Sequence, residues 1–141
     1  MQLHIIKAES DEDFNKVFEI REAVFGEELS VGADDEYDGM DHISNHYLAI
    51  LDGIVVGTAR WRLGPLVHEI RMERFAVLPT YRNQGIGTAL FHAMRKGISD
   101  KIPIVVYANE GSVSFYETLG FIKDGEPFDE AGLPHQSMRL G

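Results

Sequence analysis

Apolar and polar positions in the first third of the chain follow two different periods. Residues 3–6, "LHII", are a short apolar run typical of a strand. Ser10 with Asp13 three residues on resembles a capping box, and the spacing of the apolar positions that follow predicts a helix over 11–25. Those positions are Phe14, Val17, Phe18, Val24 and Phe25. Residues 26–45 are polar, acidic and aperiodic, which predicts a long loop of the kind that often covers a site.

Strand patterns fill the middle of the chain. Residues 46–63 hold two β-rich runs separated by Asp52-Gly53, which suits a type I′ hairpin because both central residues of that turn need positive φ. Residues 68–77 then alternate strictly. The alternation puts Ile70, Met72, Arg74 and Ala76 on one face and Glu69, Arg71, Glu73, Phe75 and Val77 on the other. Both faces carry charge, so we expect part of this strand to meet water or a ligand.

The last third returns to a mixture of helices and strands. A helix is predicted from residue 86 to near Gly97, a central strand over the apolar run 103–108, and a helix over 112–121 that stops at Gly120. Two strands, 121–125 and 136–140, close the chain. The order strand, glycine loop, helix, strand, helix is a β-α-β unit within an otherwise antiparallel sheet, which predicts an α/β class.

Composition narrows the class of protein. A chain of 141 residues fits a single domain over 1–141, and the absence of cysteine excludes disulfides and a thiol nucleophile. The net charge of −10 argues against a nucleic-acid partner, since binding phosphates needs a basic patch. No apolar run approaches the roughly 20 residues of a membrane span, and the first residues lack the apolar core of a signal peptide, so we expect a cytoplasmic protein.

The chain offers two patterns to a metal ion, and neither is complete. His42 and His46 are four residues apart but have no obvious third ligand, and the acidic residues over 34–38 miss the spacing of an EF-hand loop. We therefore predict no metal site.

The stretch "RNQGIGT" between strand and helix has two interpretations. Glycines at a helix start expose backbone N–H groups and the positive end of the helix dipole, and Arg82 adds a fork of donors, so the stretch suits a pyrophosphate. It matches neither a P-loop nor a dinucleotide fingerprint, which needs Gly or Ala where Leu90 stands. The alternative is a tight turn into a helix with no ligand.

The same stretch carries a family resemblance when it is read with its surroundings. The pattern Arg-x-x-Gly-x-Gly after "FAVLPTY", with Asn109 and "FYETLGF" downstream, resembles the GNAT family of acyl-CoA-dependent N-acetyltransferases. The resemblance covers nearly the whole chain and extends to "IREAVFGEEL", "ARWRL" and "FDEAGLPHQSM", an arrangement similar to a small bacterial branch. It implies a GNAT-like fold with a central splayed strand pair and flanking helices, and acetyl-CoA as co-substrate.

The resemblance also implies a set of cofactor-binding residues. The backbone of the strand at Phe75, Ala76 and Val77 would bond the pantetheine arm as an added strand does. The pyrophosphate would lie on the loop Arg82, Asn83, Gln84, Gly85, Ile86, Gly87 and Thr88. Asn109 matches the position that bonds the pantetheine; its alternative role is a helix cap or turn former.

Catalytic roles follow from the same resemblance. Tyr116 matches the tyrosine that protonates the leaving thiolate, although a Phe-Tyr pair in an amphipathic helix is also typical of a core. Glu73, on the cofactor strand, is a candidate general base or else one half of a surface ion pair with its arginine neighbours. His135 is a candidate base or substrate contact, with a turn residue as the alternative. Glu27 and Glu28 would line the acceptor pocket, or form a solvated charge pair.

These features predict an enzyme that moves acetyl directly to a primary amine, without a covalent intermediate. The net negative charge and the acidic segment 27–41 suggest a small cationic acceptor. Arg71 stands where better-known relatives have glutamate, so the first alternative is a non-catalytic CoA-binding or sensing module of the same fold. A structural domain without a nucleotide ligand is the second. A homodimer is an expectation from family habit alone.

Overall fold

The computed structural model describes residues 2–64 and 68–141, without the side chains of residues 34 and 35. The strands are β1 (Leu3–Lys7), β2 (Asn45–Leu51), β3 (Ile54–Leu63), β4 (Ile70–Val77), β5 (Ile104–Asn109), β6 (Phe121–Lys123), β7 (Phe128–Glu130) and β8 (Leu133–Leu140). The α-helices are α1 (Asp11–Arg21), α2 (Ala33–Glu36), α3 (Ile86–Lys96) and α4 (Val113–Thr118). A π-helical segment, Glu22–Glu28, continues α1.

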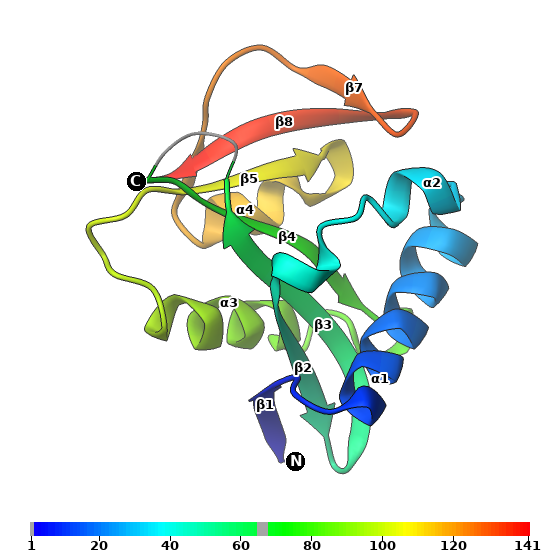
Figure 1. Cartoon of the computed structure of the whole chain (residues 1–141). Helices are drawn as coiled ribbons and strands as arrows, with labels where there is room; N and C mark the ends of the chain where they lie inside the picture. The colour runs from blue at the N-terminus through cyan, green and yellow to red at the C-terminus, as the bar shows by residue number, and fades with distance from the viewer. Residues whose placement is uncertain (1, 65–67) are drawn as a thin grey trace.

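All the strands join one sheet. Its order is β1-β2-β3-β4-β5-β8-β6, and β7 pairs with the start of β8, residues 133–135 (Figure 1). Among the described strands, β4 and β5 make the parallel pair and the other pairs are antiparallel. This confirms the predicted α/β class with a mixed, mostly antiparallel sheet.

Helices cover both faces of this sheet (Figure 1). The main apolar core lies between the sheet and α3 and α4, and includes Met72, Leu90 and Met94, each fully buried. On the opposite face α1 packs on β2, β3 and β4 through smaller clusters around Val17 and Ile20. No helix in residues 2–64 or 68–141 is long and apolar enough to cross a membrane.

The first helix begins where its capping pattern predicts. The Ser10 hydroxyl accepts a hydrogen bond from the Asp13 N–H, and the Asp13 carboxylate accepts one from the Ser10 N–H. The helix extends beyond the predicted residue 25, because its last turns widen into the π-helical segment that ends at Glu28. The loop predicted over 26–45 is interrupted by α2 and by a short 3-10 turn at Asp41–Ile43.

Strict alternation along residues 68–77 is wrong beyond Glu73. Arg60 of β3 pairs with Glu73, but Thr58 pairs with Ala76, so β4 has one extra residue at this point. Arg74 takes φ of 59° there, which is a β-bulge. The bulge moves Phe75 onto the face with Met72 and the main core, and turns Ala76 toward α1.

Two predicted turns are present in the structure, and the last strand is longer than predicted. Asp52 and Gly53 both have positive φ, 49° and 83°, as the predicted type I′ hairpin requires. Gly120, at φ 100°, follows the end of α4 as predicted. The final strand is longer than the predicted 136–140, because it begins at Leu133 and pairs with the unpredicted β7.

Candidate active site

A large cavity opens where β4 and β5 separate. The two strands pair only at Ile70 with Ile104 and Arg71 with Val105, and the bulge at Arg74 then turns β4 away. The gap leads into a cavity of about 670 Å³. Residues of β4, the segment 81–88 and α4 line it, together with residues of the π-helical segment.

The glycine stretch forms one end of this cavity and starts α3. Gly85 has φ of 80°, and a side chain there would meet no atom within 4 Å, so its backbone conformation is the reason for glycine. Gly87 is glycine for a different reason: a Cβ would lie 3.0 Å from the ring of Phe115. With no side chain at either position, the first N–H groups of α3 border open space.

Arg82 is already held by two partners. Its Nε donates to the Val77 carbonyl at 2.9 Å, and its terminal nitrogens donate to both carboxylate oxygens of Glu28. That guanidinium holds the pKa of Glu28 below its usual range. Glu28 therefore lies on the larger cavity beside the glycine loop, whereas the sequence predicted it in the acceptor pocket. Glu27 is exposed and lines neither described cavity.

The backbone of β4 presents one unpaired edge to the gap. Leu78 N–H donates to Val56 of β3, and Ala76 pairs with Thr58, so the alternate residues Phe75 and Val77 direct their N–H and carbonyl groups away from β3. The carbonyl of Val77 accepts from Arg82, which leaves its N–H toward the cavity.

Tyr116 lies in the wall of the large cavity. Its ring contacts Phe75, Phe115 and Phe121 edge-on, and it is only 7% exposed. Burial, with a smaller contribution from the charge of Glu73, raises the pKa of its phenol well above the usual value. The hydroxyl has no hydrogen-bond partner within the described part of the chain, so its proton is available to a ligand.

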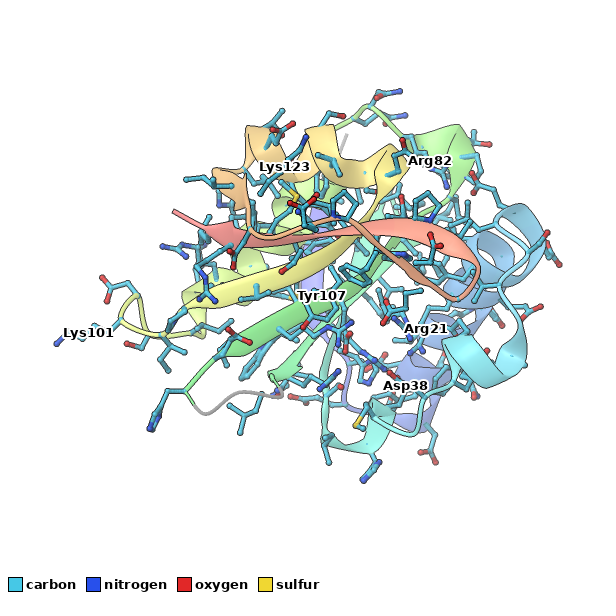
Figure 2. The ribbon with its side chains drawn as sticks, turned by 90° about the horizontal axis from the view of Figure 1, so that it is seen from above. Arg21, Asp38, Arg82, Lys101, Tyr107 and Lys123 are labelled. Carbon is cyan, nitrogen blue, oxygen red and sulfur yellow. The ribbon has the colours of Figure 1, made fainter. Side chains whose placement is uncertain are left out.

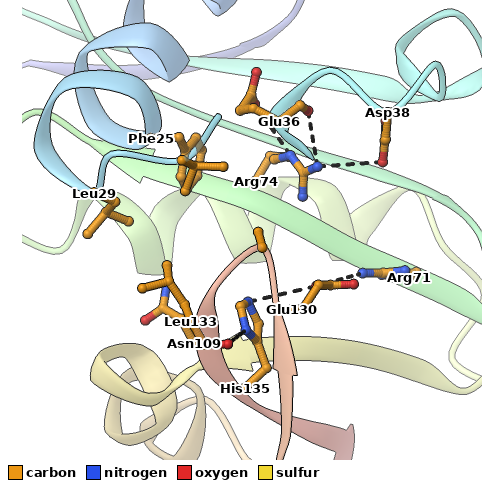
Figure 3. Close-up of a pocket in the computed structure, with 12 residues that line it drawn as sticks. Phe25, Leu29, Glu36, Asp38, Arg71, Arg74, Asn109, Glu130, Leu133 and His135 are labelled. Atoms are coloured by element: carbon orange, nitrogen blue, oxygen red, sulfur yellow. Dashed lines mark hydrogen bonds and ion pairs between the residues drawn. The ribbon is translucent and has the colours of Figure 1, made fainter. Parts of the chain in front are cut away.

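A smaller pocket of about 280 Å³ adjoins the first one. The two share Phe25, Leu29 and Asn109 in their walls, so a molecule in each would meet at these residues. Asn109 does not cap the turn that follows it, and its side-chain amide makes no hydrogen bond to the described residues. Figure 3 shows Arg74 with Glu36 and Asp38 on one side of this pocket, and His135 with Glu130 on the other.

His135 faces the smaller pocket from β8. Its Nδ1 lies 2.8 Å from the Leu133 carbonyl, which can only accept, so Nδ1 carries the proton and Nε2 is the basic nitrogen of the neutral ring. Nε2 lies 3.8 Å from a carboxylate oxygen of Glu130. The ring stacks on Phe128, and β5 places Asn109 directly opposite on the neighbouring strand.

Glu73 is surrounded by arginines. It is 6% exposed, and its Oε1 accepts from Arg60 at 2.7 and 3.0 Å and from Arg62 at 2.6 Å, while Oε2 lies 3.0 Å from Arg71 Nε. Burial opposes its ionisation, but these charges outweigh burial and hold the pKa of the carboxyl below its usual range. Glu73 lines neither pocket and is no surface ion pair, so the geometry disfavours the role of base.

The arginines belong to a larger buried network on the α1 side of the sheet. Arg21 and Arg60 are 1% and 0% exposed, and both donate to Asp41. Arg21 also pairs with Glu36, and Arg60 with Asp38. Figure 2 shows Arg21 and Asp38 close together beside α1 and α2, away from Arg82. His46 is also buried here, which lowers the pKa of its imidazole.

Sequence reasoning missed this network, although a signal was present. Arg60 and Arg62 on one strand, with Arg71 and Glu73 on the next, recur at the two-residue period that puts side chains on one face. Charged residues at successive same-face positions of a central strand need buried partners. The acidic members of the network, Glu36, Asp38 and Asp41, come from the segment predicted as a long acidic loop.

The chain is similar to a known protein family and to several proteins of known sequence or structure. Residues 7–141 match the family model described as an acetyltransferase (GNAT) domain. BSU40680 of Bacillus subtilis (strain 168) is 32% identical over 141 residues, covering 96% of this chain and 95% of that protein. The uncharacterized N-acetyltransferase YjcF of the same organism is 31% identical, covering 93% and 94%. The crystal structure of an acyl-CoA N-acyltransferase from Pseudomonas aeruginosa shares the fold, with a TM-score of 0.85 at 22% identity, covering 99% of this chain and all of that one.

Proposed function

The chain belongs to the acetyltransferase (GNAT) family, and from that premise we propose that it transfers acetyl from acetyl-CoA directly to the primary amine of a small acceptor. The observation that carries this proposal is the meeting of two pockets in the gap between β4 and β5. The larger offers a glycine loop, an open strand edge and a tyrosine hydroxyl. The smaller offers a histidine. We also propose that the protein acts in the cytoplasm.

Acetyl-CoA fits the larger cavity by its chemistry. The N-terminal N–H groups of α3, beside Gly85 and Gly87, suit the pyrophosphate, and the outward N–H of Val77 suits an amide carbonyl of the pantetheine. Asn109 has an amide with both donor and acceptor available at the junction of the pockets. No metal is needed, because these groups stabilise charge by hydrogen bonding.

The reaction removes two protons from the ammonium of the acceptor and gives one to sulfur. The bound ammonium first gives a proton to Nε2 of His135, which releases it to water. The neutral nitrogen then attacks the thioester carbonyl carbon, the C–S bond breaks, and its electron pair goes to sulfur. The nitrogen gives its second proton to the same Nε2, and Tyr116 donates its proton to the thiolate and regains one from water. A buried phenol keeps its proton until the thiolate forms, and the same dry cavity makes that thiolate more basic.

His135 is the base that the geometry favours, in place of Glu73. It faces the acceptor pocket with a fixed tautomer, and Glu130 stands 3.8 Å from the nitrogen that becomes protonated. Glu73 by contrast pairs with three guanidinium groups and lines neither pocket.

His135→Gln should therefore lower kcat by about a hundredfold near neutral pH, because an acceptor without a base must arrive already deprotonated. The variant should recover toward wild-type rates as pH rises and the free amine becomes abundant. Free-thiol release measured across pH tests this. A variant with unchanged kcat at pH 7 would remove His135 from the mechanism.

The proposal is tested first by the melting temperature with excess acetyl-CoA, with ATP and NAD as controls. Ligand at about one hundred times its dissociation constant stabilises a protein by roughly 2.7 kcal/mol, which shifts melting by several degrees. A rise with acetyl-CoA alone is expected. An unchanged melting temperature at millimolar acetyl-CoA would refute both the acetyltransferase hypothesis and the alternative of a non-catalytic CoA-binding module. The glycine stretch would then be a turn into a helix with no ligand.

Arg82→Gln and Glu28→Gln should affect acetyl-CoA binding in opposite ways. Arg82 holds the Val77 carbonyl and supplies positive charge beside the loop, so its loss should raise the dissociation constant about tenfold. Glu28 competes with phosphate for the same guanidinium, so its neutralisation should keep affinity equal or tighten it. Isothermal titration of both variants checks this, and equal weakening in both would contradict it.

A further inference from the structure

We propose that the acceptor is a small amino acid-like molecule whose carboxylate is bound by Arg71 and whose amine lies toward Glu130 and His135. The inference rests on the proposed function and names the class of its acceptor. It replaces the cationic acceptor that net charge suggested, because the walls of the pocket decide what binds there. Those walls contain both signs of charge.

Arg71 shares its nearest carboxylate with other arginines. Its near carboxylate is Glu73, at 3.0 Å, and that one carboxylate also pairs with Arg60 and Arg62. Among the described residues, Arg62 has no other carboxylate within 4.0 Å, whereas Arg71 also has Glu130 at 3.9 Å. Arg71 is the one of these two arginines that lines the smaller pocket, so its guanidinium shares Glu73 behind it and has Glu130 beside it in the pocket wall.

Ring contacts hold Arg71 and His135 in fixed relative positions. The Arg71 guanidinium lies over the Tyr107 ring, 4.0 Å from its centroid. Tyr107 contacts Phe128 edge-on, and Phe128 stacks on His135. A guanidinium fixed in this way loses little freedom when a carboxylate binds, which favours recognition of that group.

Glu130 supplies the opposite charge on the same side. Its Oε2 lies 3.9 Å from Arg71 Nη2 and 3.8 Å from His135 Nε2, beyond hydrogen-bond length in both cases (Figure 3). Arg71 and Glu130 therefore keep donors and acceptors for a ligand between them. An α-amino acid carries a carboxylate and an ammonium on one carbon, which complements two opposite charges this close together.

The size and position of the pocket agree with such a molecule. About 280 Å³ is at the low end for ligand sites and accommodates an acceptor of amino-acid size. The apolar residues Phe25, Leu29 and Leu133 line part of the pocket and would contact a side chain. The amine beside His135 also lies toward Asn109, where the two pockets meet.

The test is a set of matched acceptors followed by thiol release. L-Amino acids with charged, polar, aliphatic and aromatic side chains are each compared with the corresponding α-carboxamide and decarboxylated amine. For the accepted side chain, kcat/KM for the acid should exceed that for its amide at least tenfold in the wild type. In Arg71→Gln the ratio should fall to about one, and Arg71→Lys should retain part of it. Glu130→Gln should lower acid and amide equally, since both carry the ammonium.

Two results overturn the inference while leaving the proposed function intact. One is transfer to amides or decarboxylated amines as fast as to acids, and the other is an acid preference that survives in Arg71→Gln. If wild-type protein binds acetyl-CoA but acetylates no member of the set, the acceptor assignment is also wrong. Absence of acetyl-CoA binding refutes the proposed function itself.

Discussion

Replacing Tyr116 by phenylalanine should lower kcat about a thousandfold and leave acetyl-CoA affinity within about twofold of wild type. The substitution removes only the hydroxyl, so the ring still packs against Phe75, Phe115 and Phe121 and the cavity keeps its shape. What is lost is the proton donor to the leaving thiolate, and general acid catalysis contributes roughly 10² to 10⁴ in rate. Free-thiol release gives kcat, and calorimetric titration gives the affinity.

The matched control is Tyr47→Phe. Tyr47 is partly buried against the same core but lines neither cavity, so removal of its hydroxyl should leave kcat unchanged. Equal rates in wild type and Tyr116→Phe would assign Tyr116 to the core, which is the alternative its sequence context allows. A wild-type protein that binds acetyl-CoA but acetylates no amine would instead favour the non-catalytic CoA-binding module.

Glu73→Gln should lower the free energy of unfolding by about 3–5 kcal/mol, the range for breaking a buried ion pair. The substitution preserves size but leaves Arg60, Arg62 and Arg71 without the carboxylate they share. Buried charge without a partner is the cause of the loss. Urea unfolding at pH 7 measures it, and an unchanged midpoint there would show that the arginines need no countercharge.

The pH dependence of this loss has a definite sign. The folded-state pKa of Glu73 is held below its usual range, so the stability it contributes is present above about pH 4.3, the unfolded value, and is lost as pH falls through the folded value. The difference in the free energy of unfolding between wild type and Glu73→Gln should therefore be full at pH 7 and become small below about pH 4.

The control variant is Glu19→Gln, which breaks an exposed ion pair with Lys16. It should lower the free energy of unfolding by no more than about 1 kcal/mol.

Local patterns in the sequence were sufficient for most of the fold. The Ser10 cap, the Asp52-Gly53 turn and the stop at Gly120 each depend on the backbone of a few neighbouring residues, and all three appear in the structure. The same holds for the mixed sheet, because the periods of its segments and the order strand, helix, strand restrict the topology strongly. The bulge in β4 has no comparable local signal. It forms because β4 has one more residue than β3 between two neighbouring pairs. As a result Phe75 packs against the main core and Ala76 faces α1, the reverse of the predicted alternation.

The site divides in the same way. From the sequence by itself, residue type and spacing made the glycine stretch a candidate, and the resemblance to the GNAT family added Tyr116, Asn109 and His135. Only the tertiary structure decided that Glu28 pairs with Arg82, that Glu73 is enclosed by arginines, and that Arg71 lies beside Glu130 in the wall of a pocket. The physical reason is that a charged side chain takes its role from partners far away in the chain. Its type and spacing do not specify those partners, and folding brings them within a few ångströms.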